Sequence, residues 1–151
     1  MNSHPLHNPE NRRSSFTGSS TRVDLLRLQK SVLDFGRQCG AGEQNLARLK
    51  LILEEVLLNI GQHAYSSEPG PILIDASPAR NNDMRLLTLA ITDWGPPFNP
   101  LADSPVPNLD ADLDERPIGG LGIHLVCQMA SSVSYARLPE GQNRLVLSVE
   151  L

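Results

Sequence analysis

The sequence has little of what marks disulfide-rich, thiolate-metal or membrane-spanning proteins. Only two of its 151 residues are cysteines, Cys39 and Cys127. Neither has a Cys-x-x-Cys neighbour, so we expect two reduced, mostly buried thiols and neither a metal site nor a disulfide framework. No apolar run approaches the roughly 20 residues that cross a bilayer, and the first residues are polar where a signal peptide has an apolar segment. These absences predict a cytoplasmic protein with no membrane partner.

Positive charge is also scarce and scattered. The chain has 13 Lys and Arg residues against 17 Asp and Glu residues, and its net charge is −4 at pH 7. Proteins that hold DNA or RNA contact the phosphates through clustered Lys and Arg, and the sequence has no such cluster. We therefore expect no nucleic-acid partner. A single nucleotide stays compatible with this charge, because backbone amides and a metal ion can neutralise its phosphates.

What the sequence does contain is enough for one domain. Apolar residues make up 40% of the chain and charged residues 20%, as in ordinary globular proteins. Residues 1–20 are rich in Asn, Ser, Pro and Arg and predict a flexible tail, in which a short strand near Phe16 is left open. Residues 21–151 predict a single domain.

Helical periodicity dominates the first half of that domain. Thr21 followed by Asp24 resembles a capping box, and apolar residues then recur at helical spacing. Gly40 and Gly42 end this helix. A second helix is predicted for residues 43–65, where a Ser-Ser-Glu-Pro-Gly cluster ends it.

Short β-rich segments and one irregular segment fill the second half. Residues 72–76 and 86–93 predict a hairpin, with turn residues from 78 to 83 between them. Residues 96–117 carry six prolines and no periodicity, which is typical of a functional lid or a disordered segment. The remaining elements are a helix at residues 123–131 and two final strands at residues 133–138 and 144–151, which flank a turn at residues 139–143. This order predicts an α+β fold, a two-layer α/β sandwich with a mixed, mostly antiparallel sheet and helices on one face.

Three segments carry residues suited to chemistry, and the first lies on the second predicted helix. Glu55, Asn59, Gln62 and His63 fall within one quadrant of this helix, opposite an apolar face. A polar stripe on a largely buried helix costs free energy unless a partner satisfies it. A carboxylate, a carboxamide oxygen and an imidazole could hold hydrated Mg²⁺ and position a hydroxyl or a water. The alternative is a solvated polar face.

The second segment lies at the end of a predicted strand. The strand ends at Asp93, and Gly95 then lets the chain turn sharply. A carboxylate in this place can accept a hydrogen bond from an exocyclic amine such as that of adenine. The alternative is a plain Asp-Gly-Pro turn.

The third segment runs from Arg116 to Ile123 and contains Gly-Gly-Leu-Gly at the start of a helix. Free backbone amides and the positive end of the helix could hold a phosphate there, and ordinary helix capping is the alternative. The segment is not a P-loop, because it lacks Gly-Lys-Ser/Thr. It is not a dinucleotide fingerprint either, because a proline-rich loop precedes it where that motif needs a strand.

In their order, the three segments resemble the N, G1 and G2 boxes of the GHKL (Bergerat-fold) ATPases. A helix with Glu-x-x-x-Asn precedes Asp-x-Gly at a strand end, a variable loop and Gly-Gly-Leu-Gly at a helix start. Within that superfamily, three stretches are similar to the anti-sigma-factor serine kinases, at residues 59–65, 95–100 and 116–123. The resemblance covers residues 21–151 and implies the histidine-kinase-like ATPase fold.

The resemblance also implies roles for single residues. Asn59 would be the Mg²⁺ ligand and Glu55 the general base of phosphoryl transfer. Asp93 would bind the adenine amino group of ATP, with Gly95 giving the base room. His63 faces the same site from the helix, without an implied role.

An ATP lid is implied for residues from about 99 to 116. Arg116, at its end, could meet the γ-phosphate. Contacts to the phosphates are implied for the loop formed by Gly119, Gly120, Leu121 and Gly122. Pro97 stands where many members of the superfamily have a glycine, and because proline fixes φ we expect a stiffer lid hinge.

The implied activity is that of a protein serine/threonine kinase that uses ATP and Mg²⁺. Its substrate would be an anti-anti-sigma (STAS-type) protein, and it would hold a sigma factor or another regulator in check. A homodimer through the sheet edge or the tail is compatible with the analogy. Two alternatives stay open: a nucleotide-dependent binding switch without kinase activity, and the detached ATPase half of a two-component histidine kinase. We do not expect a complete histidine kinase, because a phosphoacceptor-His helix and a sensor are lacking.

Overall fold

A five-stranded antiparallel sheet forms one layer of the fold in the computed structural model, which describes residues 12–103 and 120–151. Its strands lie in the order β1-β2-β3-β5-β4. Every neighbouring pair is antiparallel, so the sheet is more regular than the mixed, mostly antiparallel sheet that the sequence predicts. The strands are β1 (Ser14–Ser19), β2 (Pro71–Asn81), β3 (Met84–Asp93), β4 (Ser132–Arg137) and β5 (Asn143–Glu150).

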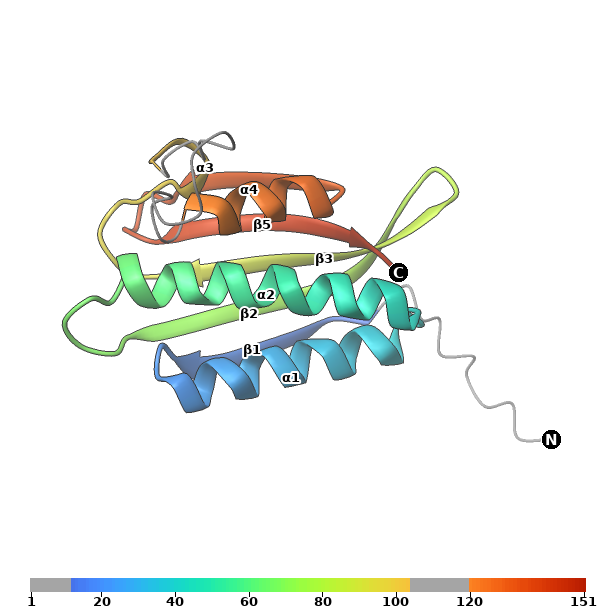
Figure 1. Cartoon of the computed structure of the whole chain (residues 1–151), viewed down its shortest axis with the longest axis horizontal. Coiled ribbons are helices and arrows are strands. Elements are labelled where there is room, and N and C mark those ends of the chain that lie inside the picture. The colour runs from blue at the N-terminus through green and yellow to red at the C-terminus, as the bar shows by residue number, and fades with distance from the viewer. Residues whose placement is uncertain (1–11, 104–119) are drawn as a thin grey trace, which may run out of the picture.

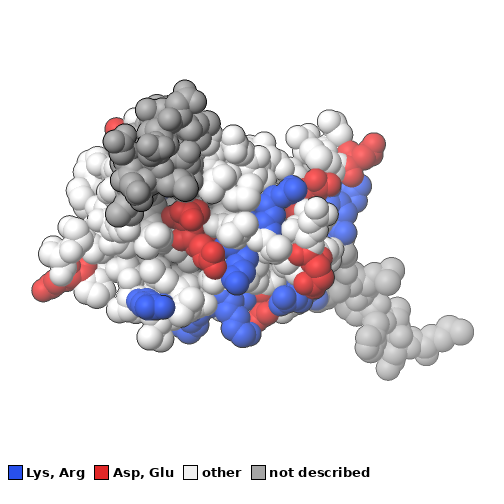
Figure 2. Space-filling view, viewed as in Figure 1, with Lys and Arg blue, Asp and Glu red and all other residues white. Residues whose placement is uncertain are grey.

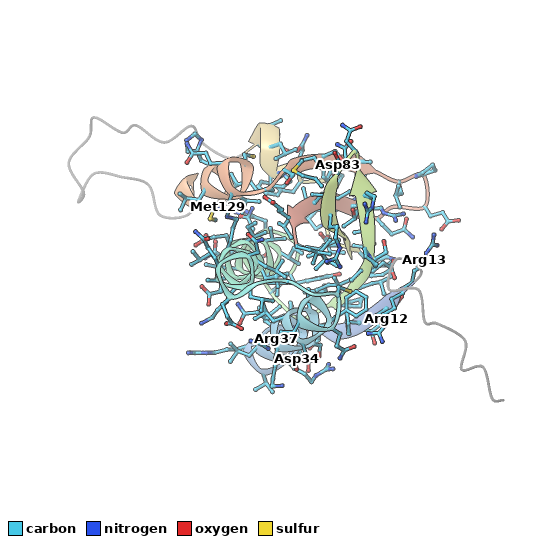
Figure 3. All side chains as sticks on the ribbon, turned by 90° about the vertical axis from the view of Figure 1, so that its right-hand side faces the viewer. Arg12, Arg13, Asp34, Arg37, Asp83 and Met129 are labelled. Atoms are coloured by element: carbon cyan, nitrogen blue, oxygen red, sulfur yellow. The ribbon has the colours of Figure 1, made fainter. Side chains whose placement is uncertain are left out.

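Helices form the second layer. Figure 1 shows three of them side by side across one face of the sheet, namely α1 (Arg22–Gln38), α2 (Glu43–His63) and α4 (Gly120–Met129). The end-on view in Figure 3 separates the two layers and places Met129 of α4 in the helix layer. A short helix, α3 (Pro100–Asp103), follows β3. The predicted α+β sandwich with helices on one face is confirmed.

The core lies between the two layers because apolar side chains alternate along the central strands. Alternate residues of β2, β3 and β5 point toward the helices and are buried, as the period of two in a strand requires. The helices contribute the apolar sides of α1 and α2, which are fully buried at several positions. The strand residues concerned are Ile72, Ile74, Ala76, Leu87, Leu89, Ile91, Leu145, Leu147 and Val149.

Strand β1 lies in the segment that the sequence predicts to be a flexible tail. It pairs with β2 from Ser14 opposite Ala76 to Ser19 opposite Pro71. The Phe16 ring packs on Phe35 of α1 in a T-shaped contact, with ring centroids 6.2 Å apart. Pairing with β2 satisfies the backbone groups of β1 that point toward β2, and the aromatic contact packs β1 against the helix layer. The fold therefore includes residues before Thr21.

The β2–β3 hairpin is longer than the sequence predicts. Its strands continue to Asn81 and from Met84, through the residues expected to form the turn. Asn82 takes the tight turn with φ of 53°, a conformation that Asn tolerates better than most residues. Pro78 fits in β2 because pairing with β1 ends at Ala76, so its missing N–H falls on a free edge.

Helix α1 begins at the predicted cap. The Thr21 hydroxyl accepts a hydrogen bond from the Asp24 amide, as a capping residue does. The Asp24 carboxylate reaches back to the hydroxyl and amide of Ser19, where a capping box would reach Thr21. These two hydrogen bonds, with one from Arg27, hold the pKa of Asp24 below its usual value. The start of α1 is thereby tied to the end of β1.

The two cysteines differ in environment. Cys39 is buried, and burial raises the pKa of its thiol, whereas Cys127 is exposed on α4. The expectation that both are mostly buried is therefore wrong for Cys127, because it lies on the outer side of the helix layer. Both are free thiols in this structure.

The surface carries both signs of charge. Figure 2 shows Lys and Arg intermixed with Asp and Glu over the helix layer, without a continuous basic area on the face in view. Among the described residues, no helix combines the length and apolar character that crossing a bilayer requires.

Candidate functional site

A cleft opens between the helix layer and one end of the central strands. Its empty volume is about 420 Å³, including solvent space at its open side. Its walls are largely apolar, with polar side chains at a few positions, which is the usual make-up of a small-molecule site. The residues that line it are Val56, Asn59, Ile60, His63, Ala64, Ile91, Asp93, Phe98, Pro100, Ile123, Tyr135, Asn143 and Leu145.

The C-terminal half of α2 forms one wall of the cleft. Leu53, Val56 and Leu57 are buried against the core, and their positions fix the rotation of the helix about its axis. Asn59 and His63 lie one turn apart on the side that this rotation turns toward the cleft. Two members of the predicted polar stripe therefore line the cleft, whereas Gln62 does not line it and is exposed.

Glu55 lies against the first turn of α4. This turn is formed by Gly120, Leu121 and Gly122, and a Cβ on Gly122 would overlap Glu55 Oε2. Glycine at position 122 thus lets a carboxylate lie directly against a helix start, where backbone N–H groups lack partners within the helix. Within the described ranges, Glu55 makes no hydrogen bond or ion pair. Its side chain is half-buried.

Asp93 places a buried carboxylate in the cleft at the end of β3. Its side chain is 7% exposed and lines the cleft. Oδ1 accepts hydrogen bonds from the Gly95 amide and from Asn143 Nδ2, each at 2.9 Å. In the described part of the chain, Oδ2 accepts none. Oδ2 stays partly accessible, so a ligand in the cleft with an N–H group could donate to it.

Gly95 allows the turn after β3 to pack on the end of α2. A Cβ at this position would come within 2.6 Å of the Ala64 Cα. Such a contact cannot be relieved by rotating a side chain, because it involves backbone. The Gly95 carbonyl accepts a hydrogen bond from Arg137 at 2.9 Å. Gly95 is therefore needed because the turn packs directly on the backbone at Ala64, the residue that ends α2.

An aromatic pair stands beside the cleft. The His63 imidazole stacks on the Phe98 ring with centroids 4.2 Å apart and an angle of 12° between the planes. The stack joins the end of α2 to the segment that leads into α3. His63 thereby acquires a partner that the sequence does not indicate.

Tyr65 links the start of β2 to the residue that follows β3. Its hydroxyl donates to the Pro71 carbonyl at 2.7 Å and accepts from the Trp94 amide at 2.8 Å. Burial raises the pKa of Tyr65, and the nearby Asp93 carboxylate raises it further, whereas the Trp94 amide acts in the opposite direction. The phenol therefore stays protonated at neutral pH, as its hydrogen bond to Pro71 requires.

Asn143, the first residue of β5, is the main site residue that the sequence does not reveal. Its side chain is 4% exposed and contacts Asp93 through Nδ2. Its Oδ1 accepts from the Tyr135 hydroxyl at 2.6 Å and from Arg137 at 3.0 Å. An Asn after a Gly-Gln turn reads as an ordinary turn residue, so no local signal marks it.

The structure brings together part of the predicted set. Asn59, His63 and Asp93 line one cleft, and Glu55 with Gly122 lies next to it. Arg116 and Gly119 lie outside the described residues, as does most of the predicted lid. The described part of the predicted lid, residues 99–103, contains α3, and the Leu101 amide there donates to Asn99 Oδ1 at 3.0 Å.

The two-layer sandwich thus carries a buried carboxylate at a strand end, facing an apolar cleft beside a glycine-containing helix start. The family model for the histidine kinase-like ATPase domain matches residues 19–149. The chain therefore belongs to the histidine kinase-like ATPase family, the family of an ATP-binding domain. The resemblance to the GHKL ATPases is confirmed.

Among solved structures, the fold matches the crystal structure of the RsbU and RsbW domains of Rv1364c from Mycobacterium tuberculosis. The TM-score is 0.61 and the sequence identity 14%, and the match covers 91% of this chain and 32% of that chain. The likeness supports the fold, and the chain spans about a third of the length of the protein that it matches. Comparison with curated proteins gave no significant match.

Proposed function

We propose that the cleft binds the adenine of ATP through Asp93 and that the triphosphate extends toward the first turn of α4. The observation that carries this proposal is Asp93 in an apolar cleft, with an Oδ2 that accepts no hydrogen bond from residues 12–103 and 120–151. An apolar wall suits the faces of a purine, and a fixed acceptor suits its exocyclic amine. The phosphates would meet backbone N–H groups at the start of α4, beside the Glu55 carboxylate that lies against Gly122.

Asn59 is proposed as the Mg²⁺ ligand. Its carboxamide lines the cleft, and Mg²⁺ prefers oxygen ligands while keeping several waters. Among residues 12–103 and 120–151, no three His, Cys, Asp or Glu side chains gather at one place. A site of this kind fits a metal that reaches the protein mainly through phosphates and water. When bound, Mg²⁺ would neutralise charge on the phosphates.

Glu55 is proposed as the general base of phosphoryl transfer. It lies one helical turn before Asn59 and touches the start of α4. Its carboxylate makes no hydrogen bond or ion pair with residues 12–103 and 120–151. A carboxylate with no competing donor can accept the proton of a Ser or Thr hydroxyl as that hydroxyl is phosphorylated. Phosphoryl transfer otherwise depends on positioning and charge neutralisation.

The proposed biological role is that of an anti-sigma-type regulator. The substrate would be a Ser or Thr of an anti-anti-sigma (STAS-type) protein, and the second partner a sigma factor or another regulator. Similarity of the boxes to the anti-sigma-factor serine kinases supports this role, as does the likeness to a protein with an RsbW domain. Fold alone does not determine partners, so they rest on this analogy.

A binding switch without kinase activity is the second candidate. It would use the same cleft, because nucleotide binding needs Asp93, Asn59 and the helix start but no base. The presence of a carboxylate at Glu55 beside the helix start favours the kinase.

Transfer of labelled phosphate tests the proposed activity. The purified chain is incubated with Mg²⁺, ATP labelled at the γ-phosphate and an extract of the cells that make it, and the proteins are then separated. We expect a labelled partner whose phosphate survives acid treatment, as phosphoserine and phosphothreonine do. An acid-labile phosphate would point to a histidine and to the histidine-kinase alternative. ATP binding without any labelled protein would leave the binding switch.

A further inference from the structure

The carboxamide of Asn143 is held in one orientation by partners of fixed type. Besides the Tyr135 hydroxyl at 2.6 Å, which can donate or accept, Oδ1 faces two groups that can only donate, the Phe98 amide at 3.4 Å and the Arg137 guanidinium at 3.0 Å. Nδ2 faces the Pro96 carbonyl at 2.9 Å, with the Gly95 carbonyl at 3.5 Å, and carbonyls can only accept. A flipped carboxamide would set donors against donors and acceptors against acceptors. The Asn143 side chain therefore offers Asp93 an N–H group and nothing else.

This fixed N–H sets the orientation of the atoms at position 93. Oδ1 of Asp93 receives hydrogen bonds from two donors, Asn143 Nδ2 and the Gly95 amide, each at 2.9 Å. Both donors require an acceptor at the Oδ1 position. Whatever atom occupies the Oδ2 position is then the atom offered to a ligand in the cleft.

We propose that Asn143 is a positioning residue that determines which atom of residue 93 meets the purine. Through it the site would prefer a purine with an amino group at position 6 over one with a carbonyl there. This inference rests on the proposed nucleotide site. Asn143 acts through Asp93, so its removal should change base preference as well as affinity.

The inference predicts an unusual result for Asp93→Asn. The new carboxamide should place its oxygen at the Oδ1 position, because two donors face that position. Its NH₂ group must then occupy the Oδ2 position and present a donor to the base. A donor suits the 6-carbonyl of inosine triphosphate (ITP), whereas it opposes the 6-amino group of ATP, since a site built for one hydrogen-bonding pattern rejects the other.

Removing Asn143 should release this constraint. In Asp93→Asn combined with Asn143→Ala, only the Gly95 amide still favours an oxygen at the Oδ1 position. The carboxamide at position 93 can then turn over and offer either atom to the base. The double variant should therefore lose the preference for ITP, a change that simple loss of stability would not produce.

Fluorescence of Trp94 provides the measurement. It is the one tryptophan in the chain, follows Asp93 directly and is 44% exposed. Mg²⁺-ATP and Mg²⁺-ITP are titrated against the same sample of each variant, so the ratio of the two dissociation constants does not depend on the folded fraction. Asn143→Val replaces Asn143→Ala if the alanine variant does not fold, since valine favours strands. Asn81→Ala, at an exposed position of β2, is the matched control.

The wild type and Asn81→Ala should bind ATP at least about 10-fold more tightly than ITP. Asp93→Asn should weaken ATP about 100-fold and bind ITP at least as well as ATP. The double variant should bring the ratio close to one. An unchanged ratio in Asp93→Asn, or a preference for ITP that persists without Asn143, would overturn the inference. A wild type that binds ATP and ITP equally would also overturn it while leaving nucleotide binding intact, and failure to bind either would overturn the proposed site itself.

Discussion

Glu55→Gln is expected to lose phosphoryl transfer while keeping its affinity for Mg²⁺-ATP. Glutamine has nearly the shape of glutamate, so it can occupy the space beside Gly122. It cannot take a proton from the attacking hydroxyl, and loss of a general base slows such reactions by about 100- to 10,000-fold. The rate of transfer to the acid-stable partner, and the dissociation constant from Trp94 fluorescence, are measured on the same protein.

The neighbouring Glu54→Gln is the matched control for this prediction. Glu54 is exposed and pairs with Lys50 at 3.9 Å, on a different side of α2. It should transfer phosphate at the wild-type rate. Equal rates in the wild type and Glu55→Gln would show that Glu55 is not the base and would favour another acceptor or a substrate-supplied one.

Asp93→Ala is expected to weaken ATP binding by about 100-fold, because a buried charged acceptor is lost. It should also lower the free energy of unfolding by about 1–3 kcal/mol, since the Gly95 amide and Asn143 Nδ2 both lose their shared acceptor. Affinity is measured by fluorescence titration and stability by urea unfolding without nucleotide.

Asp75→Ala separates the two effects of the Asp93 change. Asp75 lies on β2 beside Ser15, and its side chain lines a hollow on the sheet face away from the helices. This control should leave affinity for ATP unchanged. If Asp93→Ala binds ATP as well as Asp75→Ala does, the purine does not sit against residue 93.

Most of the order of elements could be predicted from sequence because the signals are local. Apolar periodicity defines α1 and α2, and Asp93 with Gly95 marks the end of β3. Strand β1 has a weaker signal in the sequence, because only one of its six residues, Phe16, has a large apolar side chain. Its place is fixed by pairing with β2, which comes over 50 residues later.

The supporting part of the site is non-local, and the sequence does not reveal it. Asn143 gathers partners from the turn after β3 and from β4, so its importance arises only in the folded chain. The Phe98 ring that stacks on His63 also comes from a separate segment. Tyr65 belongs to a stretch that resembles the family, yet its link between Pro71 and Trp94 depends on tertiary packing.

The length of the β2–β3 hairpin could not be predicted from the sequence, for a different reason. Residues 78–81 contain a proline and polar side chains, which favour a turn by composition. They form strand because β3 supplies a partner along the whole length, up to Asn81 opposite Met84. Strand propensity is strongly dependent on such context, whereas helical periodicity is read within one segment.

Thermal unfolding with and without Mg²⁺-ATP, for the wild type and for Asn59→Ala, tests the central claim most directly. A ligand present at about 100 times its dissociation constant stabilises the folded state by roughly 2.7 kcal/mol. We predict a clear rise in the melting temperature of the wild type and little or none for Asn59→Ala, with similar melting temperatures for the two proteins in the absence of nucleotide. No rise in the wild type at millimolar Mg²⁺-ATP would contradict the claim that this cleft is a nucleotide site.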